Sequence, residues 1–484
     1  MRVYRKEDIR EIDEQAERQG FRLFALMENA GCGLADKIIP LIEREDRIVI
    51  LSGRGNNGGD GIVLARYLLL AGFNVVLTFP LGEPKTEVAK QHLQYYNSEK
   101  FEVAPWNPSE QFDVIIDALL GVGTKLPLRK NVNEMIHWCN MQKALRIAID
   151  VPTGVQANRG EVEEQGVFHA DYTFALHGVK PSAFLIPSST YYGKVTAVSI
   201  GLKQESSISV TTRKSVQNSL PGRGDSAHKG TFGTSLLVAG SDEMPGSALL
   251  AATGALRSGT GKLMIATSKL AASVIAPVVP EATYMLDGLE RISHGEIPSK
   301  IAAIGIGPGI VNEAFVQKAL EYFMKQNTPM VVDAGALLKR RNWSSKGPMI
   351  LTPHPGEFSR LTGISVKDIQ ANRIQMAKEF SQKHSVILVL KGQYSVIAFP
   401  NGKIFINPTG NSGLAKGGSG DVLTGMIVSM LATHKSIEAA VINAVYIHGL
   451  CANKWSETNS SASMVASDFK ALLPRVLKEL ETDQ

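Results

Sequence analysis

The 484-residue sequence contains only three cysteines, Cys32, Cys139 and Cys451, and they lie far apart along the chain. Three widely spaced thiols form neither a disulfide framework nor the paired spacing of a zinc site, so they fit a reducing compartment. No apolar run approaches the roughly 20 residues that a membrane-spanning helix needs. The amino-terminal stretch MRVYRKEDIREIDEQ is charged and amphipathic, unlike a secretion signal. We therefore expect a cytoplasmic protein without a membrane span.

Strong charge of one sign is also missing, because the formal net charge is only +5. Such a balance favours phosphate-bearing ligands, but there is no basic block or interleaved aromatic stripe to support nucleic-acid binding. The phosphate-binding pattern G-x-x-x-x-G-K-[ST] is absent as well. With 44% hydrophobic and 20% charged residues, the composition is that of a globular protein. The length exceeds one ordinary core and predicts at least two domains.

Residues 1–200 alternate short apolar runs with stretches of helical character. Continuous apolar strands between helices indicate a parallel sheet that is covered on both faces, which is an α/β fold. The runs expected to be strands are RIVIL, NVVLTF, DVIIDALLG, RIAIDVPTG, YTFAL and KVTAVSIGL.

Residues 201–222 are polar, rich in serine and without apolar periodicity, so they are the best linker candidate. A second α/β pattern starts near His228, and we expect helices at 248–258 and 421–432 within it. We therefore predict two domains, 1–215 and 216–484. The strands expected in the second are TSLLVAG, GKLMIAT, IAAIGIG, PMVVDAG, GPMILTP, SVILVLKG and YSVIAFP.

The loop LSGRGNNGGDG (51–61) follows one predicted strand and leads into a helix expected at 62–70. Its glycines satisfy the dinucleotide pattern G-x-G-x-x-G, but the next strand ends in Thr-Phe-Pro (78–80) and lacks the acid that holds a ribose. An ordinary NAD dehydrogenase is therefore disfavoured. A tight turn would explain the glycines, but it leaves Asn56, Asn57 and Asp60 unexplained. Their oxygens suit a polar ligand together with a hard cation.

Three strands of the first half end in polar groups, at residues 56–60, Asp117 and Asp150. A single aspartate at a strand end is often only a helix cap, whereas ligands of open parallel sheets bind where several carboxyl ends converge. Asn57, Asp117 and Thr153 could supply oxygens to a monovalent cation. Lys125 and Asp150 could serve as an acid/base pair.

The motifs LMENAG (26–31), GRGNNGGDG, DALLGVGTK and DVPTG resemble those of the NAD(P)H-hydrate epimerases, the family of the YjeF N-terminal domain. The resemblance implies a Rossmann-like three-layer domain that interconverts R- and S-NAD(P)H hydrated at C6 of the nicotinamide. It implies K⁺ held by Asn57, Asp117 and Thr153, and Asp150 as the acid/base group. Lys125 has an uncertain role, because GVGTKLPLR departs from the commoner small-residue loop. The implied hydrate contacts are Asn56, Asn57, Gly58, Gly59, Asp60, Gly121, Val122, Gly123, Thr124, Lys125, Leu126, Pro127 and Asp150.

The segment GGSGD (417–421) stands directly before an apolar helix in the second half. Successive amides at a helix N-terminus can hold a phosphate or an oxyanion, and Asp421 could take a proton from an attacking hydroxyl. The alternative is an N-cap aspartate after a flexible loop. Other candidates are His354, held between prolines in LTPHPGEF, and the lysine of LKGQYS at a strand exit. Small residues at Ala248, Ala251, Ala252 and Ala255 mostly indicate close helix packing.

Together these segments, from about 223 to 475, resemble the ADP-dependent NAD(P)H-hydrate dehydratases, a branch of the ribokinase-like α/β fold. That family phosphorylates the 6-hydroxyl of the S-hydrate from ADP with Mg²⁺, and loss of phosphate restores NAD(P)H and leaves AMP. Two departures are Gly335, where the family usually has a second aspartate after Asp333, and Lys416 in place of threonine. The resemblance implies Asp421 as the base, Gly417, Gly418, Ser419 and Gly420 as the anion hole, Lys391, Gly392, Gln393, Tyr394, Ser395 and Gly420 at the nucleotide, and Ser247, Gly309, His354 and Asp421 at the hydrate.

The pairing of the two halves indicates one repair enzyme. Water adds to nicotinamide without stereocontrol, so a dehydratase selective for S needs an epimerase to recover R. Two other functions remain open at this stage. One is a small-molecule kinase fused to a nucleotide-binding regulatory domain, and the other is a non-catalytic nucleotide sensor whose Gly335 marks a decayed site. The resemblance implies NADHX, NADPHX and ADP as substrates, and relatives that assemble suggest a homo-oligomer.

Overall fold

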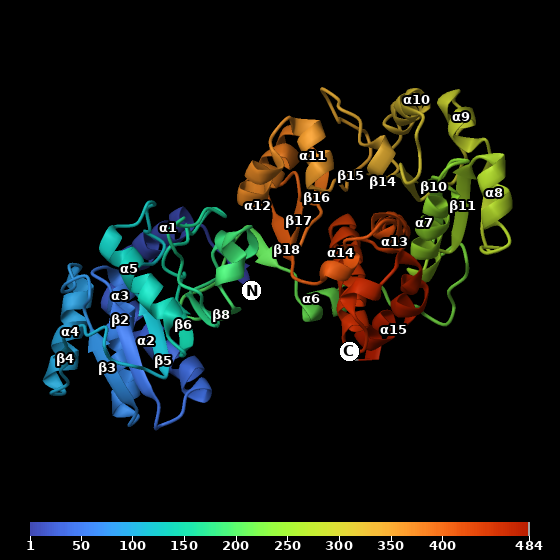
Figure 1. The fold of residues 1–484 in the computed structure, drawn as a ribbon. Helices are drawn as coiled ribbons and strands as arrows, with labels where there is room; N and C mark the ends of the chain where they lie inside the picture. Colours follow the sequence, from blue (N-terminus) through green and yellow to red (C-terminus); the bar gives the residue numbers. More distant parts are fainter. Residues whose placement is uncertain (483–484) are drawn as a thin grey trace. The chain divides into compact units, whose positions relative to one another are not determined.

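The computed structural model describes residues 1–482, and the chain divides into two compact units (Figure 1). The first unit is Met1–Ile208 with Gln370–Asn372, and the second is the rest of the chain. Each unit is built around its own sheet. The helices of the first unit are α1 (Lys6–Arg18), α2 (Leu23–Ile38), α3 (Asn56–Leu70), α4 (Glu87–Ser98) and α5 (Lys130–Met141).

The sheet of the first unit is entirely parallel, in the order β4-β3-β2-β5-β6-β7-β8. Its order reverses between β2 and β5, which creates the switch point where open α/β sheets bind ligands. The strands are β2 (Arg47–Ser52), β3 (Asn74–Thr78), β4 (Val103–Ala104), β5 (Val114–Ala118), β6 (Leu145–Ile149), β7 (Tyr172–Leu176) and β8 (Lys194–Val198). The short strand β1 (Arg2–Val3) does not belong to this sheet.

Strand β2 shows why this sheet has helices on both faces. Ile48 and Ile50 pack into a core with residues of α2 and α3, whereas Val49 and Leu51 pack into a second core with residues of α5. All four side chains are 0% exposed. Because successive strand residues point to opposite faces, an unbroken apolar strand requires cover on both. The three-layer, Rossmann-like arrangement predicted from the sequence is thereby confirmed.

The second unit holds a larger mixed sheet, in the order β9-β18-β17-β16-β15-β14-β13-β10-β11-β12. Neighbouring strands from β16 to β12 are parallel, and β16, β17 and β18 form antiparallel pairs. The strands are β9 (Ile208–Val210), β10 (Thr234–Val238), β11 (Lys262–Thr267), β12 (Thr283–Leu286), β13 (Ala303–Ile306), β14 (Met330–Val332), β15 (Met349–Leu351), β16 (Ile387–Leu390), β17 (Ser395–Ala398) and β18 (Ile404–Asn407).

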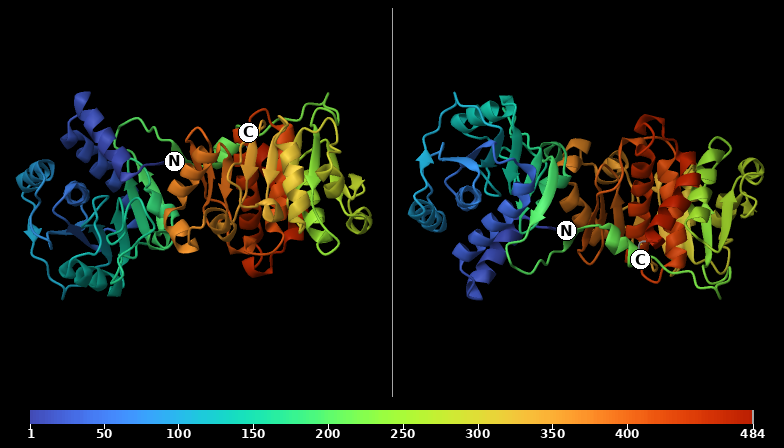
Figure 2. Two further views of the ribbon diagram at one scale, coloured as in Figure 1. Left: turned by 90° about the horizontal axis from the view of Figure 1, so that it is seen from above. Right: turned by 90° about the horizontal axis from the view of Figure 1, so that it is seen from below.

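The main core of this unit lies where α7, α13, α14 and α15 pack together (Figures 1 and 2). Helix α13 is buried along almost its whole length, because it lies between α7, α14 and the sheet. The helices of the unit are α6 (Arg213–Gln217), α7 (Pro245–Arg257), α8 (Lys269–Ile275), α9 (Gly288–Ser293), α10 (Glu313–Phe323), α11 (Pro355–Thr362), α12 (Val366–His384), α13 (Ser419–Thr433), α14 (Ile437–Ser456) and α15 (Phe469–Thr482).

All thirteen apolar runs expected to be strands in the two halves are strands. The sequence patterns missed β1, β4, β9, β12 and β18, which are short. The helix expected from residue 62 begins at Asn56 instead, so the NNGGD segment forms its first turns. No helix among residues 1–482 is long and apolar enough to cross a bilayer.

The polar stretch 201–222 contains regular structure that its composition did not predict. Strand β9 lies beside β18, and the Thr211 amide donates to the Ile406 carbonyl (2.9 Å). Thr212 then caps α6 by accepting from the Ser215 amide (3.2 Å). The units divide at 208/209, seven residues before the predicted 215/216. Independent folding of the two halves stays a prediction.

We expect a fragment 208–484 to be more stable than a fragment 216–484. The shorter fragment loses β9, the buried Val210 and the cap of α6. Burial of one such side chain and a helix cap together stabilise by about 2–3 kcal/mol, so the unfolding temperature should fall by about 5–10 °C. Thermal unfolding followed by circular dichroism measures this. Equal unfolding temperatures would show that β9 and α6 add nothing to the second unit.

Candidate functional sites

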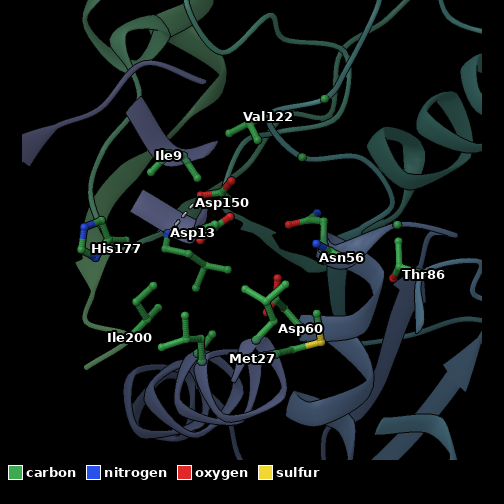
Figure 3. Close-up of a pocket in the computed structure, with 18 of the residues that line it drawn as sticks. Ile9, Asp13, Met27, Asn56, Asp60, Thr86, Val122, Asp150, His177 and Ile200 are labelled. Atoms are coloured by element: carbon green, nitrogen blue, oxygen red, sulfur yellow. Dashed lines mark hydrogen bonds between the residues drawn. The ribbon is translucent and has the colours of Figure 1, made fainter. Parts of the chain in front are cut away.

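A cavity of about 480 Å³ lies at the switch point of the first sheet (Figure 3). Its walls come from α1, α2, the start of α3 and the segments after β5, β6 and β7. It gathers residues that are far apart in the sequence. Of the predicted hydrate contacts, those lining it are Asn56, Asn57, Asp60, Gly121, Val122, Gly123, Thr124 and Asp150.

The glycines of the opening loop serve the backbone. A Cβ on Gly53 would lie 1.8 Å from the Leu119 carbonyl oxygen, and a Cβ on Gly58 would lie 1.9 Å from the Gly53 oxygen. A Cβ on Gly59 would lie 2.6 Å from the sulfur of Met27. Gly58 and Gly59 are therefore buried beneath the cavity, and their small size brings the start of α3 against β5 and α2. The polar residues of the loop then face the cavity.

Of the three residues predicted to hold a cation, Asp117 and Thr153 are hydrogen-bonded to each other, and Asn57 is linked to them through the backbone of Leu120. The Asp117 carboxylate accepts from the Thr153 hydroxyl and amide (both 2.8 Å) and from the Leu119 amide (3.0 Å). Asn57 donates to the Leu120 carbonyl (3.2 Å). Asp117 is 0% exposed, and none of the residues 1–482 forms an ion pair with it. Burial raises the pKa of Asp117 to about 6, although its hydrogen bonds oppose that rise.

Asp150 follows β6 with a φ of 68°, a left-handed conformation that is costly for a residue with a side chain. Its carboxylate accepts from the Leu176 amide (3.0 Å) and forms a close ion pair with the Lys180 ammonium. Lys180 is 1% exposed and also donates to the carbonyls of Leu176 (2.9 Å) and Gly178 (3.0 Å). These contacts fix one carboxylate oxygen at the wall of the cavity.

The structure does not bring Lys125 to Asp150, so the predicted acid/base pair of these two residues is corrected. Lys125 is exposed and lines a separate hollow with Leu126, Lys6 and Asn158. Asp150 is instead paired with Lys180, which lies in a segment that sequence reasoning did not single out. Pro127 is exposed and lines neither hollow.

Sequence reasoning missed three charged or titratable residues of the first cavity: Asp13, His177 and Lys180. Burial, with Glu17 adding repulsion, raises the pKa of Asp13 to about 6. Burial, reinforced by Asp150, raises the pKa of Asp60 well above its usual range. Burial and the Lys180 ammonium lower the pKa of His177 to about 4, so this imidazole is neutral at pH 7. The cavity therefore combines three carboxyl groups with one ammonium.

Two sequence signals could have found these residues. Lys180 and His177 follow the predicted strand YTFAL at its carboxyl end, the edge where Asp117 and Asp150 were already placed. Asp13 stands beside Ile12 and four positions after Ile9 on α1, and all three line the cavity. Helical spacing puts these positions on one face.

The second site lies at the start of α13, where Asp421 follows the left-handed Gly418 (φ 87°). Helices α7 and α13 touch through their backbones there. A Cβ on Gly425 would lie 1.9 Å from the Ala251 carbonyl oxygen, and one on Gly254 would lie 2.2 Å from the Val422 oxygen. The alanines predicted to mediate close packing, Ala248, Ala251, Ala252 and Ala255, are all 0% exposed.

Close packing of α7 and α13 places Ser247, at the start of α7, near enough to Asp421 to favour the ionised form of its carboxyl group. Gly309 (φ 66°) completes this wall, because a Cβ there would lie 2.7 Å from that of Ser247. Burial raises the pKa of Asp421 to about 6, with repulsion from Asp333 and Glu357 adding to it and Ser247 and Lys391 opposing it. Three of the four residues predicted to contact the hydrate, Ser247, Gly309 and Asp421, therefore lie together.

Lys391, at the exit of β16, is the ammonium of the second site. It donates to Asp333 (3.0 Å) and lies 4.0 Å from the Glu357 carboxylate. Asp333 also accepts from the Thr424 hydroxyl of α13 (2.8 Å), which ties three elements together. Although burial lowers it, the pKa of Lys391 is raised on balance by Asp333 and Glu357. Lys391 therefore remains cationic beside Asp421.

His354, the fourth predicted hydrate contact, caps α11 and is exposed. Its Nδ1 accepts from the Gly356 amide (3.0 Å), and its own amide donates to Glu357 (2.8 Å). His354 thereby fixes Glu357 close to Lys391. Gly335 lies in a tight turn where a Cβ would be 2.1 Å from the Ile310 oxygen. No side chain fits there without a backbone shift, so Gly335 is a packing requirement of this chain.

The predicted nucleotide segment 391–395 forms the turn between β16 and β17. The buried Arg373 holds this turn by donating to the carbonyls of Leu390 (2.7 Å) and Lys391 (2.8 Å). Gly420 approaches the same lysine, because a Cβ on it would lie 3.3 Å from Nζ of Lys391. Lys416 donates to the Ala462 carbonyl. The other predicted members are Gly392, Gln393, Tyr394 and Ser395 in the turn, and Gly417, Gly418 and Ser419 before α13.

Comparison with known proteins matches both halves. Residues 23–182 match the family described as YjeF-related protein N-terminus, and residues 235–475 match the NAD(P)H-hydrate dehydratase family. A bifunctional NAD(P)H-hydrate repair enzyme Nnr from Thermofilum pendens is 32% identical over 515 residues, covering 100% of this chain and 97% of that protein.

Two solved structures resemble the second unit. The ADP/ATP-dependent NAD(P)H-hydrate dehydratase from Bacillus subtilis, co-crystallised with ATP/Mg²⁺, is 48% identical with a TM-score of 0.55, covering 56% of this chain and 99% of that chain. A ribokinase-like superfamily protein from Enterococcus faecalis has a TM-score of 0.51 at 22% identity. The match covers 58% of this chain and 98% of that chain. The predicted ribokinase-like fold is therefore confirmed.

We expect Lys180→Met to destabilise the first unit by about 3–5 kcal/mol, because it leaves the buried Asp150 carboxylate without a counter-charge. Lys125→Met is the matched control, since that ammonium is exposed, and it should change stability by less than about 0.5 kcal/mol. Calorimetry of the full chain measures both, and hydrogen exchange in β6 and β7 localises the effect. Equal destabilisation by the two variants would contradict the structural role of Lys180.

Proposed function

The chain belongs to the bifunctional NAD(P)H-hydrate repair enzymes, and we propose that its first unit epimerises R- and S-NAD(P)HX while its second unit dehydrates the S form with ADP. The observation that carries this function is that both family matches occur on one chain, each over a unit with its own charged site. Because hydration of nicotinamide is not stereoselective, the two activities together recover both epimers.

In the epimerase, the hydrated nicotinamide occupies the cavity bordered by Asp60, Asp150 and residues 121–124. Asp150 is the acid/base group, because Lys180 and the Leu176 amide hold its carboxylate at the cavity wall. Asn56 and Asn57 contribute side-chain amides that can bind the carboxamide or the ribose. Aliphatic residues of α1 and α2 limit the water around the ring.

Potassium fits the group formed by Asn57, Asp117 and Thr153. Their side chains offer oxygens, which hard cations prefer, and the buried Asp117 has no cationic partner among the described residues. A bound cation would supply the positive charge that keeps Asp117 ionised. Asn57 belongs both to this group and to the cavity, so cation binding would also fix one wall of the substrate site.

In the dehydratase, Asp421 takes the proton of the 6-hydroxyl as this oxygen attacks the terminal phosphorus of ADP. The free amides at the start of α13, in Gly417–Gly420, receive the transferred phosphoryl group. Lys391 adds an ammonium, and the turn 391–395 with Gly420 contacts the nucleotide. Ser247, Gly309 and His354 border the hydrate.

Magnesium would accompany the phosphates of the nucleotide and neutralise part of their charge. Asp333 and Glu357 lie close enough to Lys391 to contribute carboxylate oxygens beside those phosphates. The Bacillus subtilis relative is described with both ADP and ATP, so either nucleotide is a candidate donor here. A homo-oligomer and a cytoplasmic location also stay predictions.

The rival functions differ from this proposal in their products. A small-molecule kinase would leave a stable phosphorylated compound, whereas the dehydratase releases free phosphate with one reduced cofactor per ADP consumed. A sensor would bind nucleotide without turnover. Gly335 gives no support to the decayed site that a sensor implies, because it is required by packing against Ile310.

We expect the wild-type chain to convert a mixed R,S-NADHX sample completely to NADH when ADP, Mg²⁺ and K⁺ are present. In Asp150→Asn, rapid recovery of NADH should stop once the S form is spent, because the R form is no longer epimerised. Asp421→Asn should lower the rate of dehydration by at least about 100-fold. Absorbance at the dihydronicotinamide band follows recovery, and free phosphate is assayed in parallel. A phosphorylated product that accumulates, or complete recovery by Asp421→Asn, would refute the proposal.

We expect K⁺ to stabilise the first unit through Asp117. Ions and protons compete for this carboxylate, so K⁺ stabilisation should be small at pH 5, grow as pH rises through about 6, and level off above. At pH 7.5 the unfolding temperature should rise by about 3–6 °C, corresponding to about 1–2 kcal/mol. Thermal unfolding in KCl against choline chloride measures this.

The matched variants for the K⁺ experiment are Asp117→Asn and Asn57→Ala, both of which should abolish the K⁺-dependent shift. Without K⁺, the stability of the wild-type chain should fall as pH rises from about 4 to about 6, because Asp117 loses its proton. Asp117→Asn should make this fall smaller. That sign follows because a folded-state pKa raised above the unfolded value stabilises the fold only at low pH. A K⁺ shift that persists in Asp117→Asn would place the cation elsewhere.

A further inference from the structure

Helix α1 contributes a carboxyl group to the epimerase cavity that no sequence motif indicated. Asp13 lines the cavity together with Ile9 and Ile12, and Figure 3 shows its carboxyl group beside that of Asp150. The two groups come from different elements, since Asp150 follows β6 and Asp13 lies on α1. Each also acts electrostatically on the other.

Epimerisation at C6 needs two proton transfers if the hydroxyl leaves from one face of the ring and water adds to the other. The C6–O bond breaks as a carboxylic acid protonates the oxygen, which leaves as water, and the N1 lone pair forms an N1=C6 double bond. A water molecule then adds to C6 from the opposite face, and a carboxylate accepts its proton. Atoms and charge balance without any redox partner.

We propose that Asp13 and Asp150 are the two acid–base groups of this reaction, with their roles exchanged for the R and S epimers. The inference rests on the proposed epimerase function. Asp150 is held by Lys180 and the Leu176 amide, so it serves as the carboxylate when Asp13 is protonated. When Asp13 gives up its proton, its new negative charge lies in the same cavity as the cationic ring and stabilises it.

The other groups around Asp13 are less suited to this role. Asp60 from α3 is 7% exposed, and its pKa is raised so far by burial that it holds its proton strongly. His177, after β7, is neutral and only 2% exposed. Lys180 is occupied by Asp150 and two carbonyls, and Glu17 lies on the exposed side of α1. Asp13, whose pKa is raised to about 6, can both donate and accept near neutral pH.

The experiment compares Asp13→Asn with Glu11→Gln, an exposed carboxylate on the same helix, in the full-length chain with K⁺. We expect Asp13→Asn to lower kcat of epimerisation by at least about 100-fold with little change in KM. Asp13→Glu should restore part of the rate. Dehydration of purified S-NADHX by the same preparations should be unchanged, which shows that the second unit is active, and an unchanged thermal unfolding of the first unit shows that this unit is folded.

The route is tested with R-NADHX that carries ¹⁸O on C6, in unlabelled water. The proposal requires loss of the label with every inversion, and retention of the label through repeated inversions would overturn it. The proposal would also be overturned if Asp13→Asn kept the wild-type kcat of epimerisation. The same holds if Asp60→Asn abolished epimerisation while Asp13→Asn did not. Absence of epimerisation in the wild-type chain would refute the proposed function itself, which is a separate outcome.

Discussion

The structure depends on one arrangement that occurs in both units, a partly or fully buried lysine surrounded by carboxyl groups at the carboxyl edge of a parallel sheet. In the first unit Lys180 is accompanied by Asp13, Asp60 and Asp150, and in the second Lys391 is accompanied by Asp333, Glu357 and Asp421. A buried ammonium needs paired anions, and Lys180 is paired with Asp150 while Lys391 is paired with Asp333. Burial raises the pKa values of Asp13, Asp60 and Asp421, which lie near these pairs. A single packing requirement thereby supplies groups suited to proton transfer.

Backbone contacts at glycine determine how closely these groups approach. In the first unit, Gly53 and Gly58 bring the start of α3 against the loop after β5, which places Asn57 beside Leu120 and the Asp117–Thr153 pair. In the second unit, Gly254 and Gly425 let α7 and α13 touch, which places Ser247 beside Asp421. A side chain at any of these glycines would force the elements apart, because its Cβ would lie within 2.2 Å of a facing carbonyl oxygen. The glycine-rich segments therefore act first through packing, and the ligand site is its consequence.

Much of this could be predicted from the sequence, because apolar runs determine strands and parallel strands share one carboxyl edge. The three-layer sheet and the grouping of Asn57, Asp117 and Thr153 followed from that rule. Asp13 could not be found in the same way, because it lies on a helix outside the sheet, and spacing alone does not show which element a helix face covers. The pairing of Asp150 with Lys180 instead of Lys125 depends on the left-handed backbone at Asp150 and His177, which the sequence does not show. Strand β9 was hidden in a polar stretch for a related reason, since a strand of three residues has almost no apolar pattern.

Both sites combine one ammonium with three carboxyl groups, and they differ in the groups that surround them. The first cavity combines an excess of carboxyl groups with apolar side chains, which favours a cationic ring and disfavours phosphate. The second site places the amides of a helix N-terminus and the Lys391 ammonium around Asp421, which favours a phosphoryl group that carries negative charge. A single cavity could not stabilise both, because groups that favour a cation raise the energy of an anion at the same position. Division of the repair between two sheets resolves that conflict, and it requires the S-hydrate to leave one site before the other can act on it.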